Sequence, residues 1–346
     1  MKKTVYTLLI FCSVVCLFAS CANDSVKEQP LRVIFETDMG NDIDDALALD
    51  MLYKYADQNK VDLLAVSSNK NSHYSARYIA LMNSFYGYSS LLVGEVKNGA
   101  DSEGDAVNYT EIVCEYAVDS QKVFTEVERD FEESVRLYRK ILSDQPDNSV
   151  VIISVGFSTN LAQLLESSAD EFSDLTGREL VAKKVKLLSM MAGNFSRNPQ
   201  KLEYNIMKDI PAAKKVFNEW PTPIVTSPFG VGNSILYPAS SIENDFNWTE
   251  YHPLVIGYKN YLQMPYDRQT WDLTAVLYAV EPNENYFSLS ESGVVTVNDE
   301  GYTLFEPESG GNHQFLKVDS IQQERVRSRF IDLITQIPKV FSNEKE

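Results

Sequence analysis

The chain has 346 residues, of which 44% are hydrophobic and 23% charged, so it is long enough to bury a sizeable core. Its 49 acidic residues outnumber its 31 basic residues, and the formal net charge is −18. An excess of negative charge this large opposes binding to phosphate backbones and to anionic lipid. We therefore expect no nucleic-acid partner and no electrostatic attachment to a membrane.

The N-terminus has the pattern of a secretory signal. Lys2 and Lys3 precede the apolar stretch 5–18, which is too short for a comfortable membrane span. Residues 17–21, Leu-Phe-Ala-Ser-Cys, resemble the lipobox of bacterial lipoproteins, in which the cysteine is lipidated. We predict a signal peptide over 1–21 with Cys21 as the lipid anchor, a polar tether over 22–30 and a folded domain over 31–346. The protein would be exported and would meet a bacterial membrane only through its lipid. The alternative is a plain signal peptide cut near Ser20.

Cysteine usage adds one constraint. Cys12 and Cys16 lie within the predicted signal, and Cys21 is the predicted anchor, so Cys114 is the only cysteine in the body of the domain. No intramolecular disulfide is then available there, even in an oxidising compartment. Cys114 lies in an apolar and acidic helical pattern, 111–118, and we interpret it as a packed thiol.

The most informative segment is 31–50, where a short apolar strand runs into acidic residues and then into an apolar helix. Residues 33–35 read as a buried strand, and Gly40 and Asn41 mark the turn that follows. Acids at the carboxyl end of a strand lie where open α/β sheets bind ligands, and such a set of oxygen ligands suits a hard cation such as Ca²⁺. Asp44 and Asp45 could instead cap the helix. The five acids are Glu36, Asp38, Asp42, Asp44 and Asp45.

Strand-like and helical patterns alternate along the rest of the chain, which predicts βαβ units in a single α/β domain with a mostly parallel central sheet flanked by helices. A polar stretch at 97–109 predicts a surface loop. The C-terminal part predicts short strands within 288–318 and a final helix near 321–337. The other predicted strands are 63–67, 90–93, 150–154, 186–190 and 223–226, and the other helices are 76–85, 131–142, 160–167 and 211–217.

Four later stretches carry polar residues at or near the ends of these strands. Asn69 and Asn71 follow the second strand, and the segment 154–161 is a strand–turn–helix whose carbonyls could face a cation. Each of these is also consistent with ordinary turn chemistry or with a capped helix. The other two stretches contain a polar set suited to gripping a polyol, and a lone acid before an apolar helix: Asn194, Glu203 and Asn205, and then Asp272.

Together these stretches resemble the inosine-uridine nucleoside hydrolase family, the nucleoside N-ribohydrolases, from about residue 31 to near the C-terminus. The family signature D-x-D-P-G-x-D-D-A is similar to the segment 36–46, with three departures. Glu36 stands for the first aspartate, Met39 stands for the proline, and Asn41 and Asp42 form a two-residue insertion. The later family elements follow in order: the asparagine turn, the carbonyl segment 155–160, the G-N and E-F-N elements, and a Trp-Asp pair in place of His-Asp.

The resemblance implies calcium-dependent hydrolysis of the N-glycosidic bond of nucleosides or related N-ribosides to free base and ribose. Calcium would be held by Asp38, Asp45, the Val155 carbonyl and Asp272, and Asp38 would also deprotonate the attacking water. The sugar would be gripped by Asp44, Asn69, Asn194, Glu203 and Asn205. The implied partner is a small-molecule nucleoside, and homodimers or tetramers are common in the family.

The leaving base is where the pattern departs most. Many family members have a histidine before the last aspartate, and this chain has Trp271 there. An indole cannot donate a proton at useful pH, but it can stack on a purine and hydrogen-bond through its N–H. The three histidines, His73, His252 and His313, do not occupy that position, and Tyr204, Tyr266 and Arg268 are unranked candidates for the role.

Three hypotheses follow. The first is a lipid-anchored N-glycosidase that serves purine and pyrimidine salvage. The second is a non-catalytic lipoprotein that keeps calcium and binds a nucleoside or sugar, because the signature is altered and Trp271 replaces an acid. The third is a hydrolase of a different glycoside, since the insertion at Asn41 and Asp42 reshapes the mouth of the site.

Overall fold

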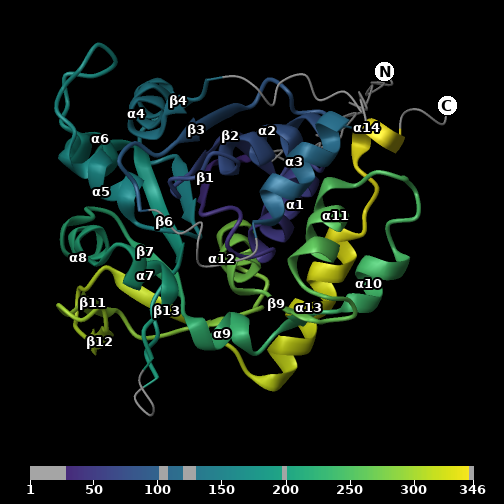
Figure 1. The fold of residues 1–346 in the computed structure, drawn as a ribbon. Coiled ribbons are helices and arrows are strands. Elements are labelled where there is room, and N and C mark those ends of the chain that lie inside the picture. The colour runs from purple at the N-terminus through teal and green to yellow at the C-terminus, as the bar shows by residue number, and fades with distance from the viewer. Residues whose placement is uncertain (1–28, 101–107, 120–129, 197–200, 343–346) are drawn as a thin grey trace, which may run out of the picture.

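A long, mostly parallel sheet runs through the computed structural model, which describes residues 29–100, 108–119, 130–196 and 201–342 (Figure 1). Its strand order is β12-β11-β13-β7-β6-β5-β1-β2-β3-β4, with β10 paired to β13. The strands from β13 to β4 in this order are parallel to their neighbours: β1 (Leu31–Thr37), β2 (Val61–Ser68), β3 (Leu92–Glu95), β4 (Glu132–Glu133), β5 (Val150–Ser154), β6 (Val185–Met191), β7 (Ile224–Ser227) and β13 (His313–Lys317).

The first strand, β1, lies at the centre of the sheet between β2 and β5. Its sequence, LRVIFET, is apolar and β-branched, as expected of a strand covered on both faces, and Val33, Ile34 and Phe35 are fully buried. In the register of the sheet, Glu36 lies opposite Ser67 of β2 and Ser154 of β5. The carboxyl ends of these three strands therefore open at the same edge.

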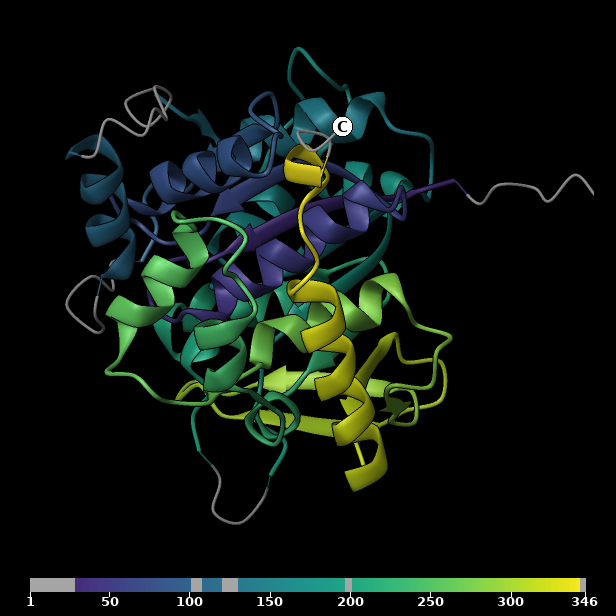
Figure 2. The same ribbon diagram turned by 90° about the vertical axis from the view of Figure 1, so that its right-hand side faces the viewer.

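Two helical layers cover the sheet, and each encloses its own apolar core. One layer contains α1 (Asp44–Asp57), α2 (Ser75–Phe85), α3 (Tyr109–Asp119), α11 (Pro253–Tyr261) and α12 (Trp271–Val280). The C-terminal helix α13 (Ser320–Ile334) packs against α1 in this layer, and Figure 2 shows it crossing the front of the molecule, followed by α14 (Lys339–Ser342). The other layer contains α4 (Ser134–Asp144), α5 (Thr159–Glu166), α6 (Gly177–Lys184) and α8 (Ile210–Glu219).

Short elements complete the fold. Beyond β13 the sheet continues with antiparallel strands, β10 (Ser288–Leu289), β11 (Gly293–Val297) and β12 (Thr303–Pro307). A separate two-stranded ribbon joins β8 (Leu236–Tyr237) to β9 (Arg268–Gln269). Three short helices, α7 (Tyr204–Lys208), α9 (Phe229–Asn233) and α10 (Ala239–Asn244), lie between β6 and α11 in the chain.

The structure confirms the predicted fold class and places a strand or helix at each predicted element. Two boundaries differ for a visible reason. The helix predicted from residue 131 begins at Ser134, because Glu132 and Glu133 pair with β3 as an edge strand. The strand predicted from residue 90 begins at Leu92, where pairing with β2 starts. Tyr109, predicted as the end of a loop, is the first residue of α3.

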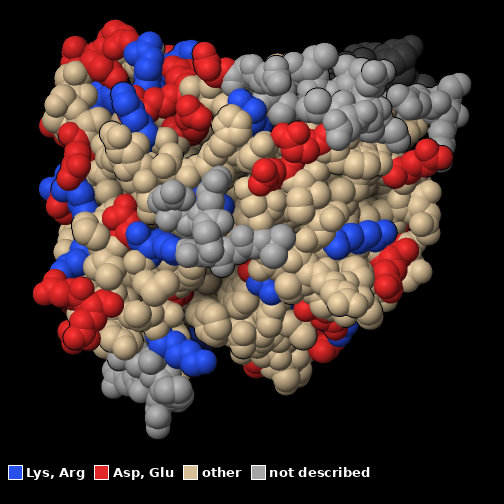
Figure 3. Space-filling model, viewed as in Figure 1, with Lys and Arg blue, Asp and Glu red and all other residues tan. Residues whose placement is uncertain are grey.

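Several predictions concern residues outside the described ranges. The signal peptide, the anchor Cys21 and most of the tether fall within residues 1–28, and part of the predicted loop falls within 101–107. Among the helices of the described residues, none is both long and apolar enough to cross a bilayer. On the face seen in Figure 3, acidic side chains gather at the upper left with basic ones among them, over the region of α4 and α6.

Cys114 is buried in α3 and unpaired, as predicted. Burial raises the pKa of its thiol to about 12, so the thiolate form is suppressed at neutral pH. A packed thiol with this environment is a poor nucleophile.

Candidate active site

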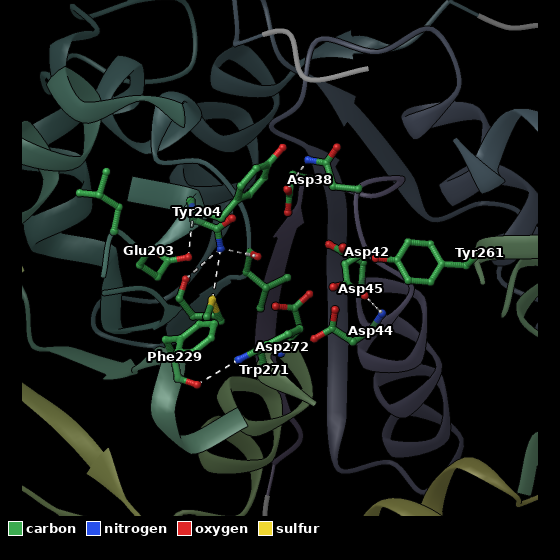
Figure 4. Close-up of a pocket in the computed structure, with 15 residues that line it drawn as sticks. Asp38, Asp42, Asp44, Asp45, Glu203, Tyr204, Phe229, Tyr261, Trp271 and Asp272 are labelled. Carbon is green, nitrogen blue, oxygen red and sulfur yellow. Dashed lines mark hydrogen bonds between the residues drawn. The ribbon is translucent and has the colours of Figure 1, made fainter. Parts of the chain in front are cut away.

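A cavity of about 320 Å³ opens where β1, β5 and β6 end (Figure 4). It lies at the carboxyl edge of the parallel sheet, where α/β folds place their ligands. Carboxylates and aromatic rings dominate its walls, and residues from seven separate parts of the chain contribute to it. The lining residues are Asp38, Asn41, Asp42, Asp44, Asp45, Val155, Met191, Leu202, Glu203, Tyr204, Asn205, Phe229, Tyr261, Trp271 and Asp272.

The turn from β1 into α1 supplies four of the acids. Gly40 adopts a φ of +114°, a conformation that glycine reaches without strain, and the chain can therefore reverse directly after Asp38. The N-cap of α1 is Ile43 and makes no side-chain cap, so Asp44 and Asp45 lie in the first turn of the helix. The interpretation of these two acids as caps is therefore wrong. Asp42 instead accepts hydrogen bonds from the backbone N–H groups of Ile43 and Asp44, at 2.6 and 3.3 Å.

Asp272 comes from the first turn of α12, and it faces the acids of α1 (Figure 4). Its backbone N–H donates to Oδ2 of Asp44 at 3.0 Å, which ties the two helix starts together. Carboxylate oxygens of Asp44, Asp45 and Asp272 lie within 4.8 Å of one another, and all three residues are buried. Three converging carboxylates are a donor set that suits a hard divalent cation.

The pKa values of these carboxyl groups show that full ionisation of the cluster is unfavourable without a nearby positive charge. Burial, reinforced by the neighbouring acids, raises the pKa values of Asp44, Asp45 and Asp272 well above their ordinary range. Burial also raises the pKa of Asp38 to about 6, although the Asn41 amide and the positive charge of Lys70 oppose the shift. A bound cation would remove this penalty, so the cluster fits a metal ion.

Asp38 is held by close neighbours on two sides. The Asn41 side-chain amide donates to its Oδ2 at 2.6 Å. On the other side Gly156 leaves no room for a side chain, because a Cβ there would lie 2.4 Å from the Asp38 nitrogen and 2.7 Å from its Oδ1. Lys70 is buried nearby, with its Nζ close to Gly40. The position of Asp38 is thus fixed by the insertion and by the 155–160 segment together.

Glu203 and Asn205 meet the Val155 carbonyl at another wall. The side-chain amide of Asn205 donates to the Val155 oxygen at 3.1 Å and to the Met191 oxygen at 3.2 Å. Glu203 is the N-cap of α7 and accepts from the backbone N–H groups of Gly193, Asn205 and Ile206. Burial raises its pKa to about 7. All three predicted residues reach the cavity, and their orientation is fixed by backbone contacts.

Asn69 and Asn194 were also predicted to bind the sugar, but neither is among the cavity-lining residues. Asn69 is fully buried and accepts a hydrogen bond from the Phe157 N–H at 3.0 Å, which places it behind the Asp38 turn. Its Nδ2 has no partner among the described residues. The side-chain oxygen of Asn194 accepts from the Ser196 N–H at 3.1 Å. Both asparagines shape the backbone that surrounds the cavity.

Glu36, the residue at the first aspartate position of the family signature, lies beneath the residues that line the cavity. It is fully buried, and it accepts hydrogen bonds from Tyr138 at 2.8 Å and from Ser154 at 2.7 Å. Burial raises its pKa to about 7, against these hydroxyls and the nearby Asn69 and Asn160 amides. Glu36 does not line the cavity, and it supports the strand ends that carry the site.

The wall that contains Trp271 is built from aromatic rings and one ion pair. The indole N–H of Trp271 donates to the Phe229 carbonyl at 3.0 Å, so the predicted hydrogen bond from this N–H to a base is not available in this arrangement. Phe229 stacks against the indole with ring centroids 5.5 Å apart. Arg268 lies behind the wall, with its guanidinium 5.0 Å from the Tyr261 ring and 5.2 Å from the Trp271 ring.

Arg268 is paired with Asp42. Its Nε–H donates to Oδ1 of Asp42 at 2.8 Å, and a terminal N–H donates to Oδ2. The sequence offers Arg268 only as one of three candidate proton donors to the leaving base, and no local pattern predicts its pairing with Asp42. Of the other two candidates, Tyr266 donates to the Tyr258 carbonyl away from the cavity, whereas Tyr204 lines it.

Comparison with protein families shows to which family the chain belongs. The family model described as inosine-uridine preferring nucleoside hydrolase matches residues 33–328, which include every residue of the cavity wall. The chain belongs to this nucleoside hydrolase family. Its members are hydrolases that cut the N-glycosidic bond of nucleosides. A search of curated protein sequences finds no match to the chain.

Solved nucleoside hydrolase structures share the fold at low sequence identity. A purine-preferring ribonucleoside hydrolase from Gardnerella vaginalis has 16% identity and a TM-score of 0.68, over 89% of this chain and 99% of that one. A plant nucleoside hydrolase has 19% identity and a TM-score of 0.65, over 89% and 100%. The inosine-uridine preferring enzyme from Bacillus anthracis has 16% identity and a TM-score of 0.63, over 88% and 99%. At these identities the likeness establishes the fold.

Proposed function

We propose that this nucleoside hydrolase is a calcium-dependent N-ribosidase that releases free base and ribose from nucleosides or related N-ribosides. The single observation that carries the proposal is the buried cluster of Asp38, Asp44, Asp45 and Asp272 in one cavity at the carboxyl edge of the sheet. Four buried acids are costly without a cation among them, and oxygen ligands from carboxylates and a carbonyl favour calcium.

In this proposal Asp38, Asp45, Asp272 and the Val155 carbonyl hold the ion. The carboxylate of Asp44 also lies within 4.8 Å of those of Asp45 and Asp272. We nevertheless assign Asp38 to the metal ion and Asp44 to the sugar. A bound calcium ion would supply positive charge that orients the sugar hydroxyls and the attacking water. The Val155 carbonyl already accepts one hydrogen bond from Asn205, and a carbonyl oxygen has a second lone pair to offer.

Asp38 is the proposed general base. Its Oδ2 accepts the Asn41 amide, which leaves Oδ1 to accept a proton from the attacking water. As the bond from the ribose C1′ to the base nitrogen breaks, positive charge develops on the ribose. The surrounding carboxylates stabilise that charge because they are fixed in place before the reaction begins.

Asp44, Glu203 and Asn205 are the proposed sugar ligands that line the cavity. Asn69 and Asn194 would bind the sugar only if it extended past the residues that line the cavity. Trp271 and Phe229 offer aromatic surface on which a base could stack. The proposal therefore places the sugar beside the acids and the base beside the aromatic wall.

The proposed cellular setting comes from the N-terminal sequence. We propose that the protein is exported and anchored through lipidated Cys21, where it would supply base and ribose for salvage. Metabolic labelling with a radioactive fatty acid tests the anchor. Label should enter the wild-type chain and be absent from Cys21→Ser, and label in both would contradict the assignment.

The test of the catalytic proposal uses residues 22–346, which include every described element, with a panel of purine and pyrimidine nucleosides. Free base is measured by chromatography, with and without a calcium chelator. Release that stops in chelator and returns with added calcium is the expected result. No release from any nucleoside by calcium-containing protein would favour the alternatives, a binding protein or a hydrolase of another glycoside.

A further inference from the structure

The aromatic wall of the cavity, formed by Asp42, Phe229, Tyr261 and Trp271, offers no strong proton donor to a departing base. The Trp271 N–H is bonded to the Phe229 carbonyl. Both oxygens of Asp42 accept from Arg268. Burial raises the pKa of the Tyr261 hydroxyl above its already high ordinary value, which makes it a still weaker acid. Among these four side chains, a neutral base that must be protonated as it leaves finds no suited donor. Tyr204 and Glu203 also line the cavity, but they come from the start of α7, beside the proposed sugar ligand Asn205.

The histidines do not fill this gap. All three histidines of the chain lie within the described residues, and none lines the cavity. His73 is exposed, and His252 is buried among the rings of Phe85, Phe246 and Trp248. His313 lies in β13, where its Nδ1 accepts from the Val295 N–H at 2.8 Å.

The cavity also carries more carboxyl groups than its cations can balance. Six acids line it: Asp38, Asp42, Asp44, Asp45, Glu203 and Asp272. One divalent ion, the Arg268 partner of Asp42 and the buried Lys70 near Asp38 would supply four positive charges against five aspartates and Glu203, whose carboxyl is only partly ionised at neutral pH. The residual field attracts a positively charged ligand.

Aromatic rings reinforce this preference. Tyr204, Phe229, Tyr261 and Trp271 line the cavity, and Figure 4 shows their rings arranged around the carboxylates. The faces of aromatic rings attract cations, most strongly where water is excluded. The guanidinium of Arg268 is neutralised by Asp42, so it does not present an unpaired charge to a ligand at this wall.

We propose that the preferred substrates are N-ribosides whose base already carries a positive charge, such as pyridinium ribosides. This inference rests on the N-ribosidase function proposed above. When the bond between C1′ and the ring nitrogen breaks, its electron pair stays on the nitrogen and cancels the positive charge, so the base leaves neutral without being protonated. The water oxygen bonds to C1′, and one of its protons passes to Asp38 and then to solvent.

The test compares kcat/KM for ribose release by the full chain, purified in detergent and loaded with calcium, on three ribosides. Nicotinamide riboside has a cationic base, 4-nitrophenyl riboside is neutral with a good leaving group, and inosine is neutral with a base that needs a proton. General acid catalysis is worth about 10²–10⁴ in rate. We therefore expect nicotinamide riboside to exceed inosine by about 100-fold or more, and to match or exceed the 4-nitrophenyl compound.

The other outcomes separate the two proposals. A ratio of nicotinamide riboside to inosine below about 100 overturns the inference, because a proton donor must then serve the neutral base. Faster turnover of 4-nitrophenyl riboside than of nicotinamide riboside also overturns it, since leaving ability without charge would be what the site selects. Both results leave the N-ribosidase function standing. Release of ribose from none of the three overturns that function itself.

Discussion

Arg268 and Asp42 form a two-point ion pair although 226 residues separate them in the chain. The pair joins the turn after β1 to the segment before α12, and each of these leads into a helix whose first turn carries acids of the cavity. The same guanidinium lies over the rings of Tyr261 and Trp271. One side chain therefore fixes three parts of the aromatic wall at once.

Replacement of Arg268 by methionine should raise KM for a riboside by about 10-fold, with a smaller effect on kcat, because the wall loses its common support while the acids remain. A loss of this size corresponds to about 1.4 kcal/mol of binding. Steady-state kinetics on the best substrate measure it. Arg136→Met, which removes an exposed arginine paired with Glu132 and Glu171, is the control and should leave KM unchanged. An unchanged KM in Arg268→Met would show that the pair does not shape the site.

Asp38→Asn should lower kcat by about 10²–10⁴, because an amide cannot accept the proton of the attacking water. The substitution preserves size, so the circular dichroism spectrum should stay close to wild type. Asp174→Asn, at an exposed position, is the matched control and should retain full activity. Full activity in Asp38→Asn would remove Asp38 from the role of general base.

Calcium should stabilise the folded chain, by about 2.7 kcal/mol at a concentration 100 times its Kd. Asp272→Asn should abolish most of this gain. Without calcium the variant should be at least as stable as wild type, because it removes a carboxyl whose charged form is disfavoured by burial and by the charges of Asp44 and Asp45. Thermal melts with and without chelator measure both effects. Asp50→Asn removes a buried acid outside the cavity and should keep the calcium-dependent gain; equal gains in all three proteins would place the ion elsewhere.

His313 should make stability fall in acid. Burial lowers its pKa from 6.5 to about 4, so the folded state favours the neutral ring. Its contribution is complete above pH 6.5 and is lost as the pH falls toward 4. His313→Asn retains an acceptor for the Val295 N–H but does not titrate. The stability of wild type relative to this variant, from urea denaturation, should be lower at pH 5 than at pH 7, and a difference independent of pH would contradict the account.

The sequence was sufficient to predict the fold because its local signals agree. The apolar runs at β1, β5 and β6 are short, and those at β1 and β5 are rich in β-branched residues. Helical patterns separate most of the predicted strands, so a parallel sheet was the expected result. The acids after β1 were recognisable because repulsion among so many carboxylates needs compensation. Asp272 was harder, since a lone acid before a helix usually caps it, and only its meeting with Asp44 shows its place in the cluster.

Other features depend on which partner each side chain takes. Asn194 has the residue type of a sugar ligand, but its side-chain oxygen accepts from the Ser196 N–H two residues later, a local turn contact. Asn69 is turned behind Asp38 because Phe157 takes its oxygen. The pairing of Arg268 with Asp42 and the bond from Trp271 to the Phe229 carbonyl join segments far apart in sequence. Side-chain direction at Asn69, Arg268 and Trp271 is decided by tertiary packing.

We propose that this cavity holds calcium and a ribose together, and a crystal structure of the chain grown with both would show it. We expect one calcium ion in contact with Asp38, Asp45, Asp272 and the Val155 carbonyl, and ribose hydroxyls on the ion and on Asp44, Glu203 and Asn205. A cavity that contains ribose but no ion, or calcium bound away from these carboxylates, would contradict it.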